Sequence, residues 1–255
     1  MACFARYLVL FLGGVMISPH AMEEEIANQI LLALPQISLK RLRPALECRA
    51  MVAGDVIAHV DRPIEHLHFV NRGLISFVKN MEDGRSVEIG VVGIEGISSP
   101  HTLFGMNRAI LEAVVQIPGT TFCIKRDKLH DMMDQDDAIH EILERYAHFS
   151  VAAHAQTAAC NRLHHIEERL CRWLLIAHDS ARSDTFPMTH EFLGMMLGVQ
   201  RAGVSMAASN LQKAGWIHYR HGQVTIANRS GLEKAACECY RVMTSEYEKI
   251  VRRRK

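Results

Sequence analysis

A segment in the C-terminal third of the chain carries polar residues at the spacing of one helix face. These residues are Gln200, Arg201, Ser205, Ser209 and Asn210, and the apolar residues Val204, Ala208 and Leu211 occupy the opposite face. An arginine on such a helix can form two hydrogen bonds with guanine in the major groove of DNA. The polar face therefore predicts sequence-specific DNA binding. We expect the contacts to come from Thr189, Gln200, Arg201, Ser205, Met206, Ser209, Lys213 and Arg220.

Two short helices and a strand pair are predicted to position these side chains. Thr189 can cap a first helix, and Gly198 can end it in a left-handed conformation. Gly194 lies inside this helix, where glycine lowers helix stability by roughly 1 kcal/mol relative to alanine. A second helix that crosses very close by would require a residue without a side chain at this position. Residues 214–226 then read as a turn, a strand, a His-Gly turn and another strand. This order predicts a helix-turn-helix followed by a wing, although an ordinary helical hairpin on a small sheet remains the alternative.

The overall charge restricts DNA binding to a local surface. The chain has 255 residues, of which 49% are hydrophobic and 22% charged, and its formal net charge is +1. A chain of this length has room for about two domains, and it is no general polycation. Local positive charge comes from Arg201, Lys213, Arg220 and the histidines near them, and from the tail 252–255, which alone would be weak evidence.

Cysteine and histidine spacing suggests no metal centre. The seven cysteines contain no CxxC pair, which fits a reducing compartment. Cys237 and Cys239 could form a redox or metal pair, but one intervening residue is unusual for zinc. His66 and His68 share one strand face, and His164 and His165 are adjacent, yet neither pair has a third ligand at a diagnostic spacing. We expect no metal, no cofactor and no catalytic residue, with haem ligation by a histidine as an open alternative.

The first residues resemble an export signal, because Arg6 precedes an apolar run and Ala21 follows it. Export contradicts DNA binding, and the run is too short to span a membrane. We therefore expect the natural start at Met22, a cytoplasmic location and no membrane association. Residues 1–21 are left out of the fold prediction.

The middle of the chain changes from short strands to long helices. Apolar runs between about Cys48 and Lys125 alternate with turns, the last run ending at Pro118-Gly119, which predicts a β-sandwich or barrel. A long helix over 136–163 follows, and another over 161–179 has a core of Leu170, Trp173 and Leu174. The long helix carries apolar or small residues in steps of three and four, namely Ile139, Ile142, Tyr146, Phe149, Ala153, Gln156, Cys160 and Leu163. This stripe favours a dimeric coiled coil, and packing on the β-domain is the alternative.

A glycine-punctuated β-domain, a long helix and a C-terminal winged helix together resemble the Crp–Fnr family of bacterial transcription regulators. The resemblance implies an α+β fold: a cyclic-nucleotide-binding-like β-roll (jelly roll) over 22–130, a dimerisation helix over 131–163 and a winged helix-turn-helix over 164–240. It also implies a homodimer that binds double-stranded DNA and RNA polymerase, with a small-molecule effector sensed by the β-roll. The family's use of the second helix in the major groove is a standard example of DNA recognition.

This sequence matches the family's effector-binding segment at only some positions. Gly93 corresponds to the opening glycine of the phosphate-binding segment, and Arg108 to its phosphate-binding arginine. Ile97 and Ser98 stand where the family has a glycine and a glutamate, and Ala109 replaces a small hydroxyl residue. A buried cyclic phosphate needs hydrogen-bond donors and a ribose hydroxyl needs an acceptor. We therefore expect a degenerate pocket that does not bind cyclic AMP.

The reading helix also departs from the family pattern of arginine, glutamate and a second arginine. Arg201 matches the first position, whereas Ala202 and Met206 replace the other two, so the operator should differ. The sequence thus predicts a non-enzymatic, homodimeric transcription regulator with an unidentified signal. Two alternatives stay open: a metal-dependent hydrolase on a β-barrel that uses His66 and His68, and an interaction adaptor that does not bind DNA.

Overall fold

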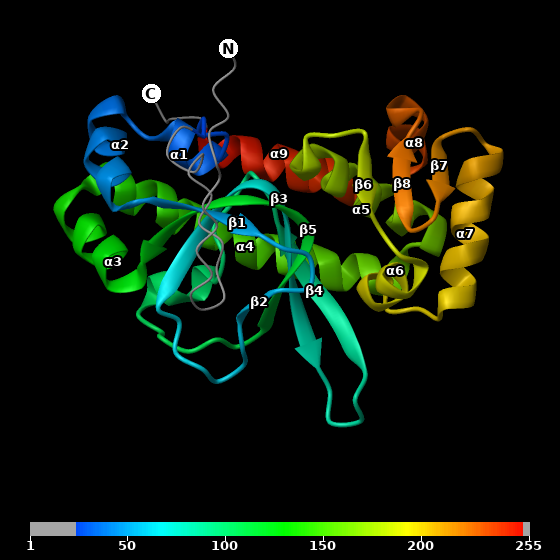
Figure 1. The fold of residues 1–255 in the computed structure, drawn as a ribbon, viewed down its shortest axis with the longest axis horizontal. Helices are drawn as coiled ribbons and strands as arrows, with labels where there is room; N and C mark the ends of the chain where they lie inside the picture. Colours follow the sequence, from blue (N-terminus) through cyan, green and yellow to red (C-terminus); the bar gives the residue numbers. More distant parts are fainter. Residues whose placement is uncertain (1–23, 252–255) are drawn as a thin grey trace, which may run out of the picture.

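The computed structural model describes residues 24–251. Strands of a β-roll lie at one end of the molecule and a helical unit with its own small sheet lies at the other (Figure 1). The expected start at Met22, the signal-like segment 1–21 and the basic tail 252–255 fall outside the described residues. None of the helices within residues 24–251 combines the length and the apolar character needed to span a bilayer.

The β-roll is one antiparallel sheet preceded by short helices. Helices α1 (Gln29–Ala33) and α2 (Gln36–Leu42) and the 3-10 turn η2 (Arg43–Ala45) lead into the sheet. Its strands are β1 (Glu47–Met51), β2 (Val56–Ala58), β3 (His66–Asn80), β4 (Ser86–Val92) and β5 (Glu112–Lys125), with the turn η3 (Pro100–Phe104) before β5. The strand order is β1-β5-β3-β4, and β2 pairs with β5. The sheet therefore curls around a core of its own.

Two strands are longer than the sequence predicted. The runs around His66 and Leu74 join into the single strand β3, and β5 continues through Pro118-Gly119 instead of ending there. The register of the two strands shifts between Val70 and Ile75, which marks bulges that bend them together. Gly73 has φ 95°, and a Cβ at Gly119 would lie 2.0 Å from the carbonyl oxygen of Arg72. Glycine at these positions permits a close approach that any side chain would prevent.

Helix α3 (Arg126–Gln135) is followed by the long helix α4 (Asp137–Leu163), which runs from the β-roll towards the other end of the molecule (Figure 1). Asp136 caps α4 by accepting a hydrogen bond from the amide of Ala138. The apolar stripe assigned to a dimer seam instead faces the chain's own core: Ile142 is 3% exposed and packs with β-roll residues. The seam prediction for Ile139, Ile142, Tyr146 and Phe149 was therefore wrong, because this face already covers the β-roll.

The C-terminal unit continues from α4 with only a short break. It consists of α5 (Ile166–Ala181), β6 (Thr185–Pro187), α6 (His190–Leu197), α7 (Arg201–Lys213), β7 (Ile217–Arg220), β8 (Gln223–Ile226) and α8 (Arg229–Ala235). Leu170, Trp173 and Leu174 are buried in α5 as predicted. Helix α9 (Cys239–Val251) then returns to α4, and its Tyr247 and Ile250 enter the β-roll core.

The two ends of the molecule share a hydrophobic core. Leu74 and Val78 of β3 and Ile117 of β5 belong to the same buried cluster as Trp173 of α5 and Met196 of α6. A β-roll strand therefore contacts both the supporting helix and the first helix of the helix-turn-helix.

Candidate DNA-binding interface and sensor domain

Helices α6 and α7 form a helix-turn-helix whose local geometry follows from three residues. The hydroxyl of Thr189 accepts a hydrogen bond from the amide of Phe192 at 3.1 Å and caps α6. Gly198 ends α6 with φ 61°, the left-handed conformation that glycine tolerates. A Cβ at Gly194 would lie 3.0 Å from the carbonyl oxygen of Val199. The predicted close approach at Gly194 is therefore present, and its partner is the turn between the helices.

Helix α7 buries one face and exposes the other. Val204, Ala208 and Leu211 are buried, as the apolar pattern predicted. Gln200, the N-cap of α7, and Arg201 are exposed at the start of the helix, Lys213 is exposed at its end, and Met206 is 64% exposed. Ser209 is half-buried. The start of α7 thus presents an amide, a guanidinium and a thioether to solvent.

Ser205 is already engaged within the protein. Its hydroxyl donates to the carbonyl oxygen of Arg201 at 3.0 Å and lies 2.9 Å from Nδ1 of His190. The ring of His190 stacks on that of Tyr219, with centroids 4.2 Å apart. Burial, followed by the charge of Arg201, lowers the pKa of His190, so its ring is neutral near pH 7. No periodic pattern in the sequence indicated this group, which ties the two helices to the wing.

The wing is a three-stranded sheet in the order β6-β8-β7. His221 and Gly222 form the turn between β7 and β8 with φ angles of 49° and 72°. Arg220 is exposed immediately before this turn. The hydroxyl of Tyr219 donates to the carbonyl oxygen of Met188 at 2.8 Å and fixes the wing to the segment before α6.

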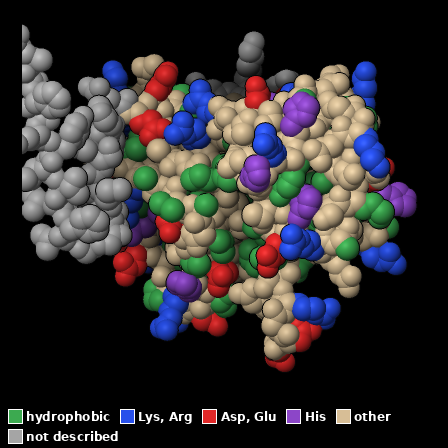
Figure 2. Space-filling model, turned by 45° about the vertical axis from the view of Figure 1, so that its right-hand side comes forward, with side chains coloured by type: hydrophobic (Ala, Val, Ile, Leu, Met, Phe, Trp, Pro, Cys, Tyr) green, Lys and Arg blue, Asp and Glu red, His purple; other side chains and the backbone are tan. Residues whose placement is uncertain are grey.

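Basic side chains and histidines are exposed on α7 and the wing of the C-terminal unit. In Figure 2, Lys, Arg and His side chains lie along the right-hand rim of the face that includes this unit. The exposed residues of α7 and the wing include Arg201, Lys213, His218, Arg220 and His221. This is a local positive surface on a chain whose net charge is only +1, which is the charge distribution that a DNA-binding module requires.

The two residues expected to bind an effector lie in different surroundings. Gly93 is buried against α5, and a Cβ there would lie 1.9 Å from Oγ of Ser180. Arg108 is exposed, and its guanidinium donates to the carbonyl oxygen of Asp61 at 2.6 Å. The described contacts of these residues do not bring them together around one pocket.

The three positions of the β-roll that depart from the family pattern are buried. Ile97 and Ala109 are buried in the β-roll core at 0% and 1% exposure. Ser98 is also buried, and its hydroxyl accepts a hydrogen bond from the amide of His68 at 3.0 Å. The side chains of Ile97 and Ala109 carry no donor or acceptor for a cyclic phosphate or a ribose, and the hydroxyl oxygen of Ser98 already accepts a hydrogen bond within the protein.

A buried carboxyl group lies where the β-roll meets the C-terminal unit. Glu88 of β4 accepts a hydrogen bond from the hydroxyl of Ser76 at 2.7 Å and from Nε1 of Trp173 in α5 at 3.2 Å. Burial raises the pKa of Glu88 to about 7. The hydrogen bond from Ser76, the charge of Arg172 and the hydrogen bond from Trp173 act in the opposite direction but offset only part of this effect. An ionisable group thus connects the β-roll to α5, the helix that supports the helix-turn-helix.

The histidines proposed as hydrolase ligands do not form a metal centre. Burial lowers the pKa of His68 to about 4, and its Nδ1 has no hydrogen-bond partner. His66 lines an open groove of about 820 Å³ between β1 and α3. Among residues 24–251, the single group of three or more potential ligands lies elsewhere, at Cys160, His164, Cys237 and Cys239. The separate pairs seen in the sequence did not reveal this group.

Two family models match the chain, one over the β-roll and one over the C-terminal unit. A cyclic nucleotide-binding domain matches residues 48–136, and a Crp-like helix-turn-helix domain matches residues 168–235. No curated protein matches the chain.

Solved structures of similar fold cover most of the chain. FixK2 from Bradyrhizobium japonicum is 20% identical with a TM-score of 0.61 and covers 75% of this chain and 98% of its own. A CRP-family regulator from Thermus thermophilus is 18% identical with a TM-score of 0.60, over 74% and 96% of the two chains. The c-di-GMP responsive regulator CLP from Xanthomonas campestris is 14% identical with a TM-score of 0.58, over 75% and 99%. These likenesses show the fold.

Proposed function

Because the chain belongs to the Crp–Fnr family of transcription regulators, we propose that it binds its operator as a homodimer and reads each half-site with α7. The observation that carries this proposal is the exposed start of α7, where Gln200 and Arg201 project beside a turn fixed by Gly194 and Gly198. In this geometry the N-terminal residues of the second helix contact base edges.

The side chains divide between base reading and backbone contact. Arg201 can form two hydrogen bonds with one guanine, and Met206 can meet the methyl group of thymine through apolar contact. Lys213 at the end of α7 and Arg220 on the wing suit phosphate contacts, which position the protein without reading sequence. Ser205 and Thr189 serve mainly to hold the helices in place, because their hydroxyls already bond within the protein.

The proposed dimer contact lies on the face of α4 opposite the β-roll core. Exposed residues follow each other in steps of three and four along that face: His148, Val151, Ala155, Ala158 and Arg162. Val151 is 62% exposed although it is apolar. A second copy of α4 could cover this stripe in a coiled-coil contact, and two-fold symmetry would present two reading helices to a symmetric operator.

The proposed regulator is not an enzyme and acts where chromosomal DNA is found, in the cytoplasm. Its working units are the sensor β-roll over 22–130, the dimer helix over 131–163 and the DNA-binding unit over 164–240, with RNA polymerase as a further partner. The signal sensed by the β-roll is other than cyclic AMP, because Ile97 and Ala109 are core residues and the hydroxyl of Ser98 bonds to β3.

Two arginine variants test how α7 reads DNA. Arg201→Ala should weaken operator binding by about 1–3 kcal/mol and relax the preference at one base pair per half-site. Arg220→Ala should weaken binding to all sequences alike and reduce the salt slope by about 1. Binding to single-base operator variants at several salt concentrations separates the two effects. An Arg201→Ala protein with an unchanged base preference would show that this arginine only contacts phosphate.

A further inference from the structure

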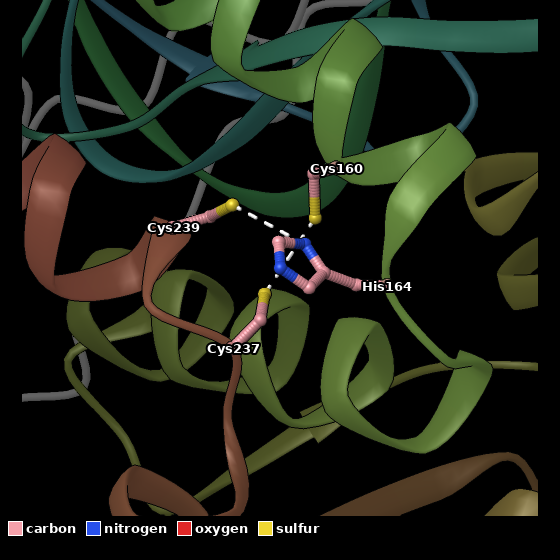
Figure 3. Close-up of side chains that lie close together, drawn as sticks. All are labelled: Cys160, His164, Cys237 and Cys239. Carbon is pink, nitrogen blue, oxygen red and sulfur yellow. Dashed lines mark hydrogen bonds between the residues drawn. The ribbon is translucent and has the colours of Figure 1, made fainter.

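Four potential metal ligands meet at the joint between the long helix and the C-terminal unit. They are Cys160, His164, Cys237 and Cys239, here called the Cys3His cluster. Cys160 lies near the end of α4 and His164 is its C-cap, whereas Cys237 lies between α8 and α9 and Cys239 begins α9. Figure 3 shows the three sulfur atoms and the imidazole ring turned towards one another. All four ligand atoms lie within 4.8 Å of one another.

The distances suit a single tetrahedral ion. The Sγ atoms of Cys160 and Cys237 are 3.6 Å apart, and Sγ of Cys239 is 3.6 Å from Nδ1 of His164. Zinc–sulfur and zinc–nitrogen bonds of about 2.3 and 2.1 Å at tetrahedral angles place the ligand atoms about 3.5–3.8 Å apart. The cluster therefore needs only small side-chain adjustments to accept an ion.

The surroundings of the cluster orient its ligands. Nε2 of His164 lies 3.0 Å from a carboxylate oxygen of Glu238, which leaves Nδ1 as the acceptor that faces the sulfur atoms. A carboxylate on the second nitrogen is the usual partner of a metal-bound histidine. The side-chain amide of Gln156 donates to Sγ of Cys239 at 3.0 Å. Such a donor stabilises a thiolate more than a neutral thiol.

Two buried arginines supply the positive charge that a three-thiolate site needs. Arg169 and Arg172 of α5 are 6% and 3% exposed, and the Nε atom of each has no hydrogen-bond partner. Both lie within electrostatic range of the thiols of Cys160 and Cys237. A divalent ion with three thiolates and one neutral imidazole has a net charge of −1, so the nearby guanidinium groups offset it.

We propose that the Cys3His cluster is a structural Zn²⁺ site. Three thiolates and one imidazole are a recognised ligand set for closed, four-coordinate zinc. An iron–sulfur cluster distributes its thiolates over several iron atoms and needs them farther apart than ligands of one ion. Within residues 24–251 the group contains four ligands and no fifth, and three of the four residues are buried, so the site holds its ion rather than performing catalysis.

The ion joins the dimer helix to the DNA-binding unit. Cys160 and His164 flank the last hydrogen-bonded turn of α4, and Cys239 begins α9. Arg169 beside the site donates to the side chain of Asn161 in α4 and to the carbonyl oxygen of Leu197 at the end of α6. Zinc therefore fixes one of the joints between the β-roll and the reading helix, beside the direct contacts of β3 and β5 with α5 and α6.

Metal analysis of the full-length protein tests the site. Protein purified under reducing conditions without chelator should contain about one zinc per chain by elemental mass spectrometry. After zinc removal, Co²⁺ titration should show one equivalent with the visible absorption of tetrahedral thiolate-bound cobalt. Cys237→Ser should abolish this absorption, whereas Cys48→Ser, a cysteine on β1 outside the cluster, should retain it.

A surface variant separates ligand orientation from folding. Glu238 is exposed, so Glu238→Gln should leave the fold intact while weakening Co²⁺ binding about 10–100-fold. Glu246→Gln in α9, away from the cluster, is the control and should bind Co²⁺ as the parent does. Co²⁺ without thiolate absorption, equal binding by Cys237→Ser, or a Cys160–Cys237 disulfide in the reduced preparation would overturn the proposal. None of these results depends on DNA binding.

Discussion

Replacing Glu88 by glutamine should change how stability depends on pH. The folded protein keeps the proton of Glu88 up to about pH 7, because burial raises its pKa from 4.5. The unfolded chain loses that proton near its ordinary value. Stability therefore falls as pH rises from about 4.5 to about 7, and it stays low above that range. A difference of 2.5 units, from 4.5 to about 7, corresponds to about 3 kcal/mol.

Glutamine can keep the local hydrogen bonds without the charge. Its carbonyl oxygen can accept from Nε1 of Trp173, and its amide nitrogen can donate to the hydroxyl of Ser76, which lie 3.2 and 2.7 Å from the carboxylate. Arg172 on α5 and His154 on α4 face the same cavity, and loss of the carboxylate near Arg172 offsets part of the gain. Glu88→Gln should therefore match the parent near pH 5 and exceed it by up to about 3 kcal/mol at pH 8.

Urea unfolding at several pH values measures this difference. The exposed Glu82→Gln in the β3–β4 hairpin is the matched control and should follow the parent curve. A Glu88→Gln protein whose stability stays parallel to the parent from pH 5 to pH 8 would refute the reasoning. So would a variant that is less stable than the parent at pH 8.

The packing of α4, of the helix-turn-helix and of the β-roll leads to three further predictions. The double variant Val151→Glu, Ala155→Glu should be monomeric in sedimentation and keep its fold. Ile142→Glu should instead unfold the β-roll, because it buries a charge in the core. A stable dimer of the double variant would show that the dimer contact lies elsewhere. Gly194→Val should lower the free energy of unfolding by about 1–3 kcal/mol, because its Cβ would lie 3.0 Å from the Val199 carbonyl oxygen; unchanged thermal unfolding would contradict this. Calorimetric titration with cyclic AMP should show no binding, because Ile97 and Ala109 are core residues; micromolar affinity would contradict this expectation.

The C-terminal unit could be predicted from the sequence because its signals are local. Thr189, Gly194 and Gly198 each act on neighbouring residues, and the structure places them as the sequence indicated. The sequence predicted that this region forms a β-domain, but it did not predict the lengths of β3 and β5. The bulges near Gly73 and Gly119 depend on pairing between distant strands, which no local pattern reports.

Long-range contacts explain the two main failures. The stripe of α4 showed that one helix face is apolar, but the sequence could not say whether a second chain or the β-roll covers it. The Cys3His cluster was missed because its two halves are separated by more than 70 residues in sequence. The local signals were the helical spacing of Cys160 and His164, four residues apart, and the Cys237/Cys239 pair, and neither alone supplies four ligands.

Selection of bound sites from random double-stranded DNA by the full-length protein tests the central claim most directly. A homodimer that reads DNA with α7 should enrich an inverted repeat whose half-sites are centred about one helical turn, or roughly 10 base pairs, apart. Its affinity should fall steeply with salt concentration, as expected for a protein that contacts phosphates on both half-sites. Absence of any enriched motif, or enrichment of a single asymmetric half-site, would contradict the account.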